Sequence, residues 1–206
     1  MNMRRLLLFA LLLTACRQRL KSGHWPFATS KDYTIVVPPG WREEHMTIPL
    51  DFAPEIPYVG TEDAYFPQGW GNSGSHEYWT YAFVWRLDGA PTLDAGTLKQ
   101  NLTDYYRGLV GRNIQRRGIL ASALVPISAT LTQISADPWD SATYTGTIHT
   151  LDYMTPAPMT LYCRVSVKAS GNTGHTLAFF QISPYPYRDS VWLSIYIMDT
   201  WLKPKH

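Results

Sequence analysis

Residues 78–87 read YWTYAFVWRL, and this stretch decides the fold. Alternate positions from Trp79 to Leu87 are large and apolar, and the positions between them are also mostly apolar as far as Arg86. Successive side chains of a strand point to opposite faces of its sheet. We therefore predict a central strand over residues 78–87 that is covered on both faces, and the turn signal Asp88-Gly89 ends it.

Two segments with helical periodicity supply the cover. Residues 91–111 predict a helix with Thr92 or Asp94 as its N-terminal cap, and a final helix is predicted with Asp189 or Ser190 as its cap. The apolar stripes are Leu98, Leu102, Tyr105, Tyr106 and Leu109 in the first helix, and Val191, Ile195, Met198 and Leu202 in the second. One helix on each face of the sheet satisfies both sides of the central strand.

Further strands are predicted on either side of the first helix. Their ranges are 33–37, 42–48, 129–134, 143–149, 160–168 and 176–182, with a hairpin loop at 170–174. Residues 49–72 carry four prolines and predict a long irregular segment with room for one short strand. Short connections favour antiparallel neighbours. We therefore predict one α+β domain over residues 31–206, an α/β/α sandwich with a single, largely antiparallel sheet.

The element order resembles the PsbP-like family of extrinsic photosystem proteins and their bacterial relatives. The resemblance is carried by the stretch from Tyr33-Thr34-Ile35-Val36-Val37-Pro38 to Trp41, and by residues 177–182 leading into the closing helix. It implies the same sandwich, and the proline-bearing segment departs from the family pattern. Because a fold does not carry a function, the resemblance implies nothing about activity.

The N-terminus resembles the precursors of bacterial lipoproteins. Arg4-Arg5 precede an apolar block over residues 6–13, and Leu13-Thr14-Ala15-Cys16 looks like a lipobox. The resemblance implies lipidation of Cys16, including a fatty acyl group such as palmitate, and cleavage before it. An ordinary signal peptide or a spanning anchor is the alternative, although a spanning helix needs about 20 apolar residues.

These features predict a signal peptide over residues 1–15 and a flexible tether over residues 16–30. The residue after Cys16 is Arg17 and not aspartate, which by the resemblance favours the outer membrane over the inner membrane. The membrane is thus one expected partner, through the lipid anchor.

Composition excludes some functions. The chain has 18 Lys+Arg and 16 Asp+Glu, and the signal peptide removes Arg4 and Arg5, which leaves 16 residues of each sign. A domain with equal numbers of basic and acidic residues has no excess positive charge to attract nucleic acid.

Cys163 lies on the apolar face of a predicted strand, so we interpret it as a buried structural thiol. Since no recognised cofactor or metal motif is present, we expect neither.

The candidate site residues fall mostly in or next to the irregular segment. The polar candidates are Glu55, Glu62, Asp63, His76 and Glu77. They could bind a divalent cation, although their spacing matches no specific metal loop, serve acid–base chemistry, or lie as ordinary charges on a solvated loop. Nearby aromatic residues could bind a partner or fold back onto the sheet. The predicted partner surface comprises Tyr58, Glu62, Asp63, Tyr65, Trp70 and His76.

Our leading hypothesis is a non-enzymatic envelope lipoprotein. Its aromatic loops, over residues 58–79, would bind a protein partner or an envelope component such as a polysaccharide. One alternative is a hydrolase of envelope polymers that uses Glu62, Asp63, His76 or Glu77. The other is a purely structural envelope component, with the aromatic residues buried in the core.

Overall fold

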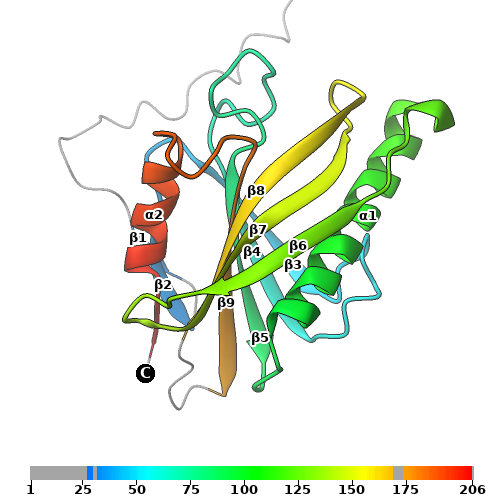
Figure 1. Ribbon diagram of the computed structural model, residues 1–206. Coiled ribbons are helices and arrows are strands. Elements are labelled where there is room, and N and C mark those ends of the chain that lie inside the picture. The colour runs from blue at the N-terminus through cyan, green and yellow to red at the C-terminus, as the bar shows by residue number, and fades with distance from the viewer. Residues whose placement is uncertain (1–26, 30–31, 169–173, 206) are drawn as a thin grey trace, which may run out of the picture.

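The computed structural model describes residues 27–29, 32–168 and 174–205 (Figure 1). The main sheet is antiparallel throughout and has the order β3-β4-β5-β9-β8-β7-β6. Its strands are β3 (Arg42–Ile48), β4 (Gly60–Phe66), β5 (Tyr81–Asp88), β6 (Ser128–Ile134), β7 (Asp140–Asp152), β8 (Ala157–Lys168) and β9 (His175–Ser183). With helices α1 (Ala95–Arg117) and α2 (Trp192–Trp201) and the short 3₁₀ turn η1 (Ala121–Ala123), the fold is α+β, as predicted.

The strand predicted to be central is β5, an interior strand of the main sheet, and it is buried on both faces. Phe83 and Trp85 belong to a core that includes Leu98 and Leu102 of α1. Ala82 and Val84 point the other way, into a second core with residues of α2. The two helices therefore cover opposite faces of the sheet, and Figure 1 shows them on either side of it. The regular strand begins at Tyr81 and not at residue 78.

The late start of β5 has a local cause. Trp79 has a φ of 55° and donates its indole N–H to Asp152 Oδ1 at 3.0 Å. A positive φ is incompatible with the extended conformation of a strand. Even so, Trp79 is fully buried in the same core as Phe83 and Trp85, so its predicted face is confirmed.

Helix α1 begins and ends later than predicted. Asp94 is its N-cap and accepts a hydrogen bond from Thr97 N at 2.7 Å, which confirms one of the two predicted caps. The helix continues past Gly111 to Arg117, and Gly118 ends it with a φ of 63°. The arginines after residue 111 are thus helical and do not lie in a loop.

A second, three-stranded sheet was not predicted. It has the order β1-β2-β10 and consists of β1 (Phe27–Thr29), β2 (Tyr33–Val36) and β10 (Lys203–Pro204). The strand predicted at 33–37 therefore does not join the main sheet. Residues 27–29 were assigned to the tether but pair with β2, because the chain entering the domain supplies an edge strand.

The proline-bearing segment is more regular than predicted. Strand β4 lies within it, between β3 and β5, and six of its seven residues are buried. The prolines at 49, 54, 57 and 67 flank β4 and leave its backbone free to pair on both sides. Cys16, the signal peptide and most of the tether and of the 170–174 loop lie outside the described residues.

Candidate functional site

Glu62 and Asp63 are neighbours on β4, so their side chains point to opposite faces of the main sheet. Glu62 is fully buried on the α1 side. It accepts hydrogen bonds from Trp85 Nε1 at 2.7 Å and from the Tyr105 hydroxyl at 2.9 Å. Burial raises the pKa of Glu62 to about 7, and the two hydrogen bonds only partly offset that rise. Glu62 is therefore a core carboxyl group and not the loop charge we expected.

Asp63 lies on the α2 side, 5% exposed. Its carboxylate accepts a hydrogen bond from the Tyr33 hydroxyl and contacts His45 Nδ1 at 2.5 Å. The hydroxyls of Tyr33 and Tyr65 are 3.3 Å apart, and Tyr65 is 1% exposed. These contacts join the small sheet to β4, so Asp63 and Tyr65 connect the two sheets and do not form an exposed partner surface.

The other polar candidates are dispersed. His76 Nε2 lies 3.0 Å from Asp189 Oδ1, next to the start of α2. Glu77 accepts a hydrogen bond from Gly69 N at 2.9 Å and so closes a turn, while Glu55 is exposed. The structure does not bring Glu62, Asp63 and His76 together.

Trp70 lines a pocket of about 570 Å³ between α1 and the segment from β3 to Phe52, hereafter the groove. A volume of this size suits a ligand or an inserted partner segment. The lining consists of Glu44, Met46, Thr47, Pro49, Leu50, Asp51, Phe52, Phe66, Trp70, Tyr81, Tyr105, Leu109, Arg112, Asn113, Arg116 and Tyr153. Of the aromatic residues predicted to form the partner surface, Trp70 lines the groove, whereas Tyr58 contacts Trp85 and accepts a hydrogen bond from Asn101.

The floor of the groove is aromatic and the rim is charged. Phe66 and Tyr81 stack with ring centroids 5.5 Å apart, and Trp70 lies edge-on to Phe66 at 4.9 Å. On the rim, Arg112 pairs with Asp51 at 2.8 Å. Arg116 and Glu44 bring the charged lining residues to two of each sign.

The groove could not be assembled from sequence spacing. Its lining comes from β3, the 49–52 connection, the last residue of β4, Trp70, the first residue of β5, α1 from Tyr105 onward, and Tyr153 after β7. The sequence feature that comes closest to indicating the groove is the group of arginines at positions 112, 116 and 117. Two of them line the groove, but nothing in the sequence indicates which segments lie opposite them.

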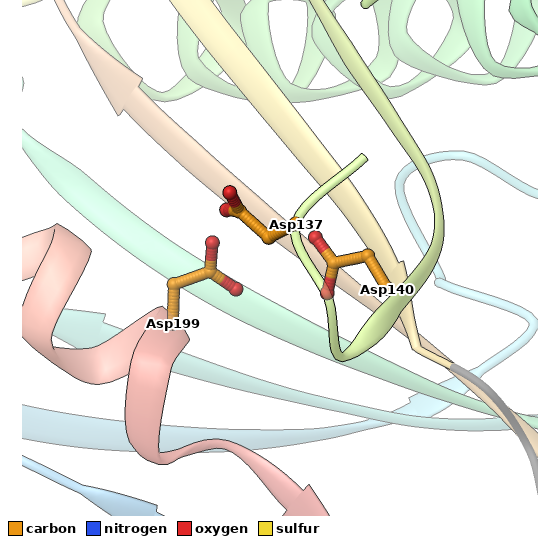
Figure 2. A group of neighbouring side chains, drawn as sticks. All are labelled: Asp137, Asp140 and Asp199. Atoms are coloured by element: carbon orange, nitrogen blue, oxygen red, sulfur yellow. The ribbon is translucent and has the colours of Figure 1, made fainter. Parts of the chain in front are cut away.

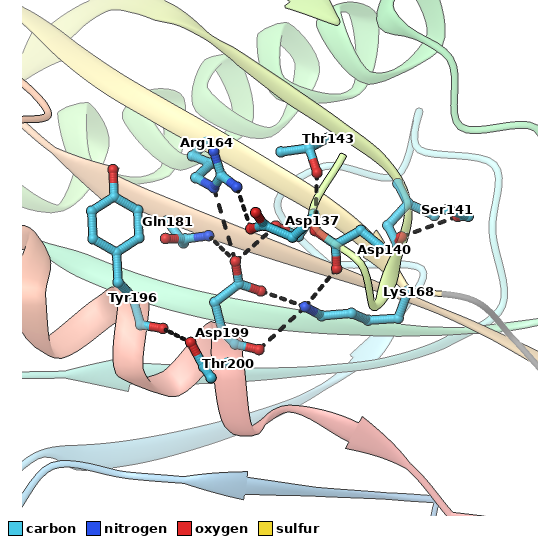
Figure 3. Close-up of polar contacts among 12 residues, drawn as sticks. Asp137, Asp140, Ser141, Thr143, Arg164, Lys168, Gln181, Tyr196, Asp199 and Thr200 are labelled. Carbon is cyan, nitrogen blue, oxygen red and sulfur yellow. Dashed lines mark hydrogen bonds and ion pairs between the residues drawn. The ribbon is translucent and has the colours of Figure 1, made fainter. Parts of the chain in front are cut away.

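A second polar cluster lies on the α2 face and was not predicted. Asp137, Asp140 and Asp199 each offer an oxygen within 4.8 Å of the others, as Figure 2 shows. Lys168, which is 1% exposed, donates to Asp140 Oδ1 at 2.8 Å and to Asp199 Oδ1 at 2.5 Å. Arg164 donates to Asp137 Oδ2 at 2.7 Å (Figure 3).

The three carboxylates already have cationic partners, since Lys168 donates to Asp140 and Asp199 and Arg164 donates to Asp137. Lys168 also donates to the backbone carbonyl of Asp199 at 3.2 Å, so its three N–H groups each have an acceptor. Burial raises the pKa of Asp140 although Lys168 acts against it. We interpret the cluster as a buried ion network that fastens α2 to the sheet.

Cys163 is fully buried, and burial raises the pKa of its thiol to about 12. A thiol that stays protonated at neutral pH is a poor nucleophile. The structure therefore supports the structural interpretation of this residue.

Neither a protein-family model nor a curated protein matches the sequence. Among solved structures, the chain is similar to the Ran-binding protein Mog1p of Saccharomyces cerevisiae, with a TM-score of 0.40 and 13% sequence identity. The alignment covers 83% of this chain and 89% of that chain. In the described part of the chain, no helix has the length and hydropathy required to span a bilayer.

Proposed function

We propose that this chain is a lipid-anchored protein of the bacterial envelope, held at the outer membrane through Cys16, and that its domain binds a protein partner in the groove without catalysing a reaction. The observation that carries the proposal is the groove itself, which combines an apolar floor, a charged rim and a volume of about 570 Å³. Apolar anchors surrounded by polar rims are typical of protein interfaces.

A protein partner fits the groove better than a polysaccharide does. A sugar ring stacks on an exposed aromatic face, but the two tyrosines of the groove floor are nearly fully buried. Tyr105 stacks on Phe83 at 5.1 Å with an interplanar angle of 3°, and Tyr81 and Tyr105 are only 2% and 4% exposed. Aliphatic side chains such as Met46 and Leu109 also line the groove, and they suit an inserted apolar side chain.

The charged rim supports the same partner class. Two arginines and two acids line the groove, so neither sign dominates. A balanced rim can hydrogen-bond the backbone and side chains of a peptide segment without favouring a polyanion.

The dispersed acid–base residues support a binding role over the hydrolase alternative. Acid–base catalysis requires its groups within reach of one substrate. Glu62 and Asp63 lie in different cores, and the partner of His76 is Asp189. We further propose that the fold is the α/β/α sandwich of PsbP-like domains, supported by the two helices on opposite faces of the sheet.

Photo-crosslinking in bacterial cells tests the groove. A photoreactive amino acid at position 113, in the groove, should give a discrete protein adduct that is lost in Leu109→Arg, which fills the groove with a charge. Position 107, exposed on the same helix but outside the lining, is the matched control and should give none. Equal adducts at 107 and 113, or an adduct at 113 that survives Leu109→Arg, would contradict the proposal.

The anchor is tested separately. Cells fed a tagged palmitate analogue should incorporate it into the native chain and not into Cys16→Ser. Incorporation that persists in Cys16→Ser, or is absent from both chains, would remove the lipid anchor and leave the groove result unaffected.

A further inference from the structure

The two edges of the main sheet differ in how they are protected. β3 forms one edge, and its exposed residues include Arg42, Glu43 and Glu44. β6 forms the other edge (Figure 1), and in the described part of the chain it pairs only with β7. The residues of β6 read SATLTQI, with neither a charge nor a proline. Charges and prolines ordinarily keep other strands from pairing with the free N–H and C=O groups of an edge, so the β6 edge is unprotected.

The uncharged surface extends beyond β6. Residues 118–136 contain no Asp, Glu, Lys, Arg or His. Leu120, Leu124 and Ile134, which lie within this range, are 74%, 47% and 37% exposed. An exposed apolar segment without charged residues is typical of the core of a protein interface. The segment therefore has the composition of a surface that another protein chain covers.

The backbone of β6 has the regularity that a further strand requires. All seven residues of β6 pair with β7 without interruption, from Ser128 opposite His149 to Ile134 opposite Thr143. The register shift of β7 lies on its other side, where it pairs with β8. Because no bulge distorts β6, alternate residues direct their backbone N–H and C=O groups outward, as the next antiparallel strand requires. The outer edge of β6 is therefore a template for pairing.

We infer that β6 is the interface between two copies of this chain, which pair antiparallel, edge to edge, about a two-fold axis so that their main sheets join. A two-fold axis brings the same surface of both copies together. Any charge on β6 would therefore face the same charge on the second copy, whereas an uncharged strand produces no such repulsion. A different protein can be selected by charges of opposite sign, so the absence of charge favours a second copy.

Pairing through β6 suits the side chains of the strand and leaves the groove accessible. An axis at Leu131 places Thr130 of each copy opposite Thr132 of the other, and both threonines are exposed. Threonines that lie opposite each other on neighbouring strands stabilise a sheet by hydrogen bonding. None of the residues that line the groove lies between 118 and 136. The inference therefore depends neither on a partner in the groove nor on the lipid anchor.

Counting the copies of the chain in detergent micelles tests the inference. Native mass spectrometry of the full chain, released from the micelles, gives that number. Thr132→Lys adds a charge to the β6 edge of both copies, and Thr92→Lys, the matched control, adds one at an exposed threonine before α1. Hydrogen exchange of the native chain at low and high protein concentration is a second measurement, and it needs no variant.

We expect two copies of the native chain and of Thr92→Lys, and one copy of Thr132→Lys. The backbone amides of residues 128–134 should exchange more slowly as the protein concentration rises, and those of β3 should not. A single copy at every concentration would overturn the inference, and so would two copies that persist in Thr132→Lys. Protection of residues 128–134 in a single copy would overturn it in favour of another segment of the same chain. Protection that appears only after envelope extract is added would overturn it in favour of a different protein.

Discussion

At the scale of single residues, Glu62 determines how the core responds to pH. Its carboxyl group is fully buried on the α1 face of the sheet, and its two hydrogen-bond partners are a tryptophan and a tyrosine. Neither partner carries a positive charge that would compensate the ionised form. Burial therefore favours the protonated acid, and the pKa rises from an ordinary 4.5 to about 7.

Replacing Glu62 with glutamine should stabilise the protein at neutral and alkaline pH. Between about pH 4.5 and 7 the native state binds a proton that the unfolded state has lost, so the stability of the native chain falls as the pH rises through this window. Glu62→Gln should lack this fall and should gain about 3 kcal/mol over the native chain near pH 8. Urea unfolding at both ends of the window measures the gain.

The amide is a fair mimic of the protonated acid. Its oxygen can accept from Trp85 Nε1, and the Tyr105 hydroxyl can rotate to accept from its N–H group. Glu55→Gln, at an exposed position, is the control and should change stability by less than about 0.5 kcal/mol at either pH. A pH dependence in Glu62→Gln that matches the native chain would show that Glu62 is not the titrating group.

The role of Glu62 could not be predicted from its local sequence. The residues around it read GTEDAYF, in which the adjacent acids suppress the alternating apolar pattern of a strand. The partners that allow its burial, Trp85 and Tyr105, lie 23 and 43 residues further along the chain. By contrast, Cys163 was predicted correctly because its neighbours alternate regularly.

At the scale of elements, helix α1 approaches the 50–53 turn at a glycine. A Cβ atom on Gly108 would lie 1.7 Å from the backbone oxygen of Phe52, so only glycine allows this contact. Phe52 in turn lies edge-on to Tyr105 at 5.1 Å and lines the groove. The width of the groove therefore depends on a contact between two backbones.

Two glycines of the same helix should give opposite results. Gly108→Ala should destabilise the fold by about 1–3 kcal/mol, because the turn at Phe52 must move away from the helix. Gly111→Ala, at an exposed helical position with no atom near the new methyl group, should stabilise it by about 0.5–1 kcal/mol. Thermal unfolding of both variants tests the pair, and a similar change in both would show that the Phe52 contact does not restrict the helix.

The type of each helix was predictable, but not all of the boundaries were: α1 ends at Arg117, and α2 has Val191 as its N-cap and no side-chain cap. The apolar spacing from Leu98 to Tyr106 predicted the face that α1 buries, and those residues are buried; Leu109, the last of the predicted stripe, is half-buried and lines the groove.

The extension to Arg117 was missed because Gly111 resembles a helix stop, although the left-handed residue that ends the helix is Gly118. An exposed glycine lowers the stability of a helix only slightly. The tertiary contacts of α1 stabilise it by more than that, so the helix continues through Gly111.

At the scale of the whole molecule, sequence could assign the two covered faces but not the groove or the second sheet. The doubly apolar stretch at 78–87 required cover on both sides, and the two cores satisfy that requirement. The groove depends on contacts among segments that are far apart in the sequence, from β3 to Tyr153. The small sheet pairs residues 27–29 with 34–36 and 33–34 with 203–204. Neither the groove nor the small sheet produces a periodic pattern of apolar residues in the sequence, because each brings together residues that are far apart along the chain.

The ion network of Lys168 connects distant parts of the chain across the α2 face. Asp140 opens β7, Lys168 ends β8 and Asp199 belongs to α2, so one ammonium group joins three elements (Figure 3). Breaking a buried pair by removing one partner leaves the other charge uncompensated, which is far more costly than losing an exposed pair.

Lys168→Met should therefore destabilise the protein by about 3–5 kcal/mol, because the buried carboxylates of Asp140 and Asp199 lose their main counter-ion. Lys99→Met, on the exposed side of α1, is the control and should stay within about 0.5 kcal/mol of the native chain. The deficit in Lys168→Met should shrink as the pH is lowered, since the pKa of Asp140 is already raised by burial and protonation removes the uncompensated charge. Urea unfolding across acidic and neutral pH measures both effects. A small deficit that does not vary with pH would mean that the network does not stabilise the packing of α2 against the sheet.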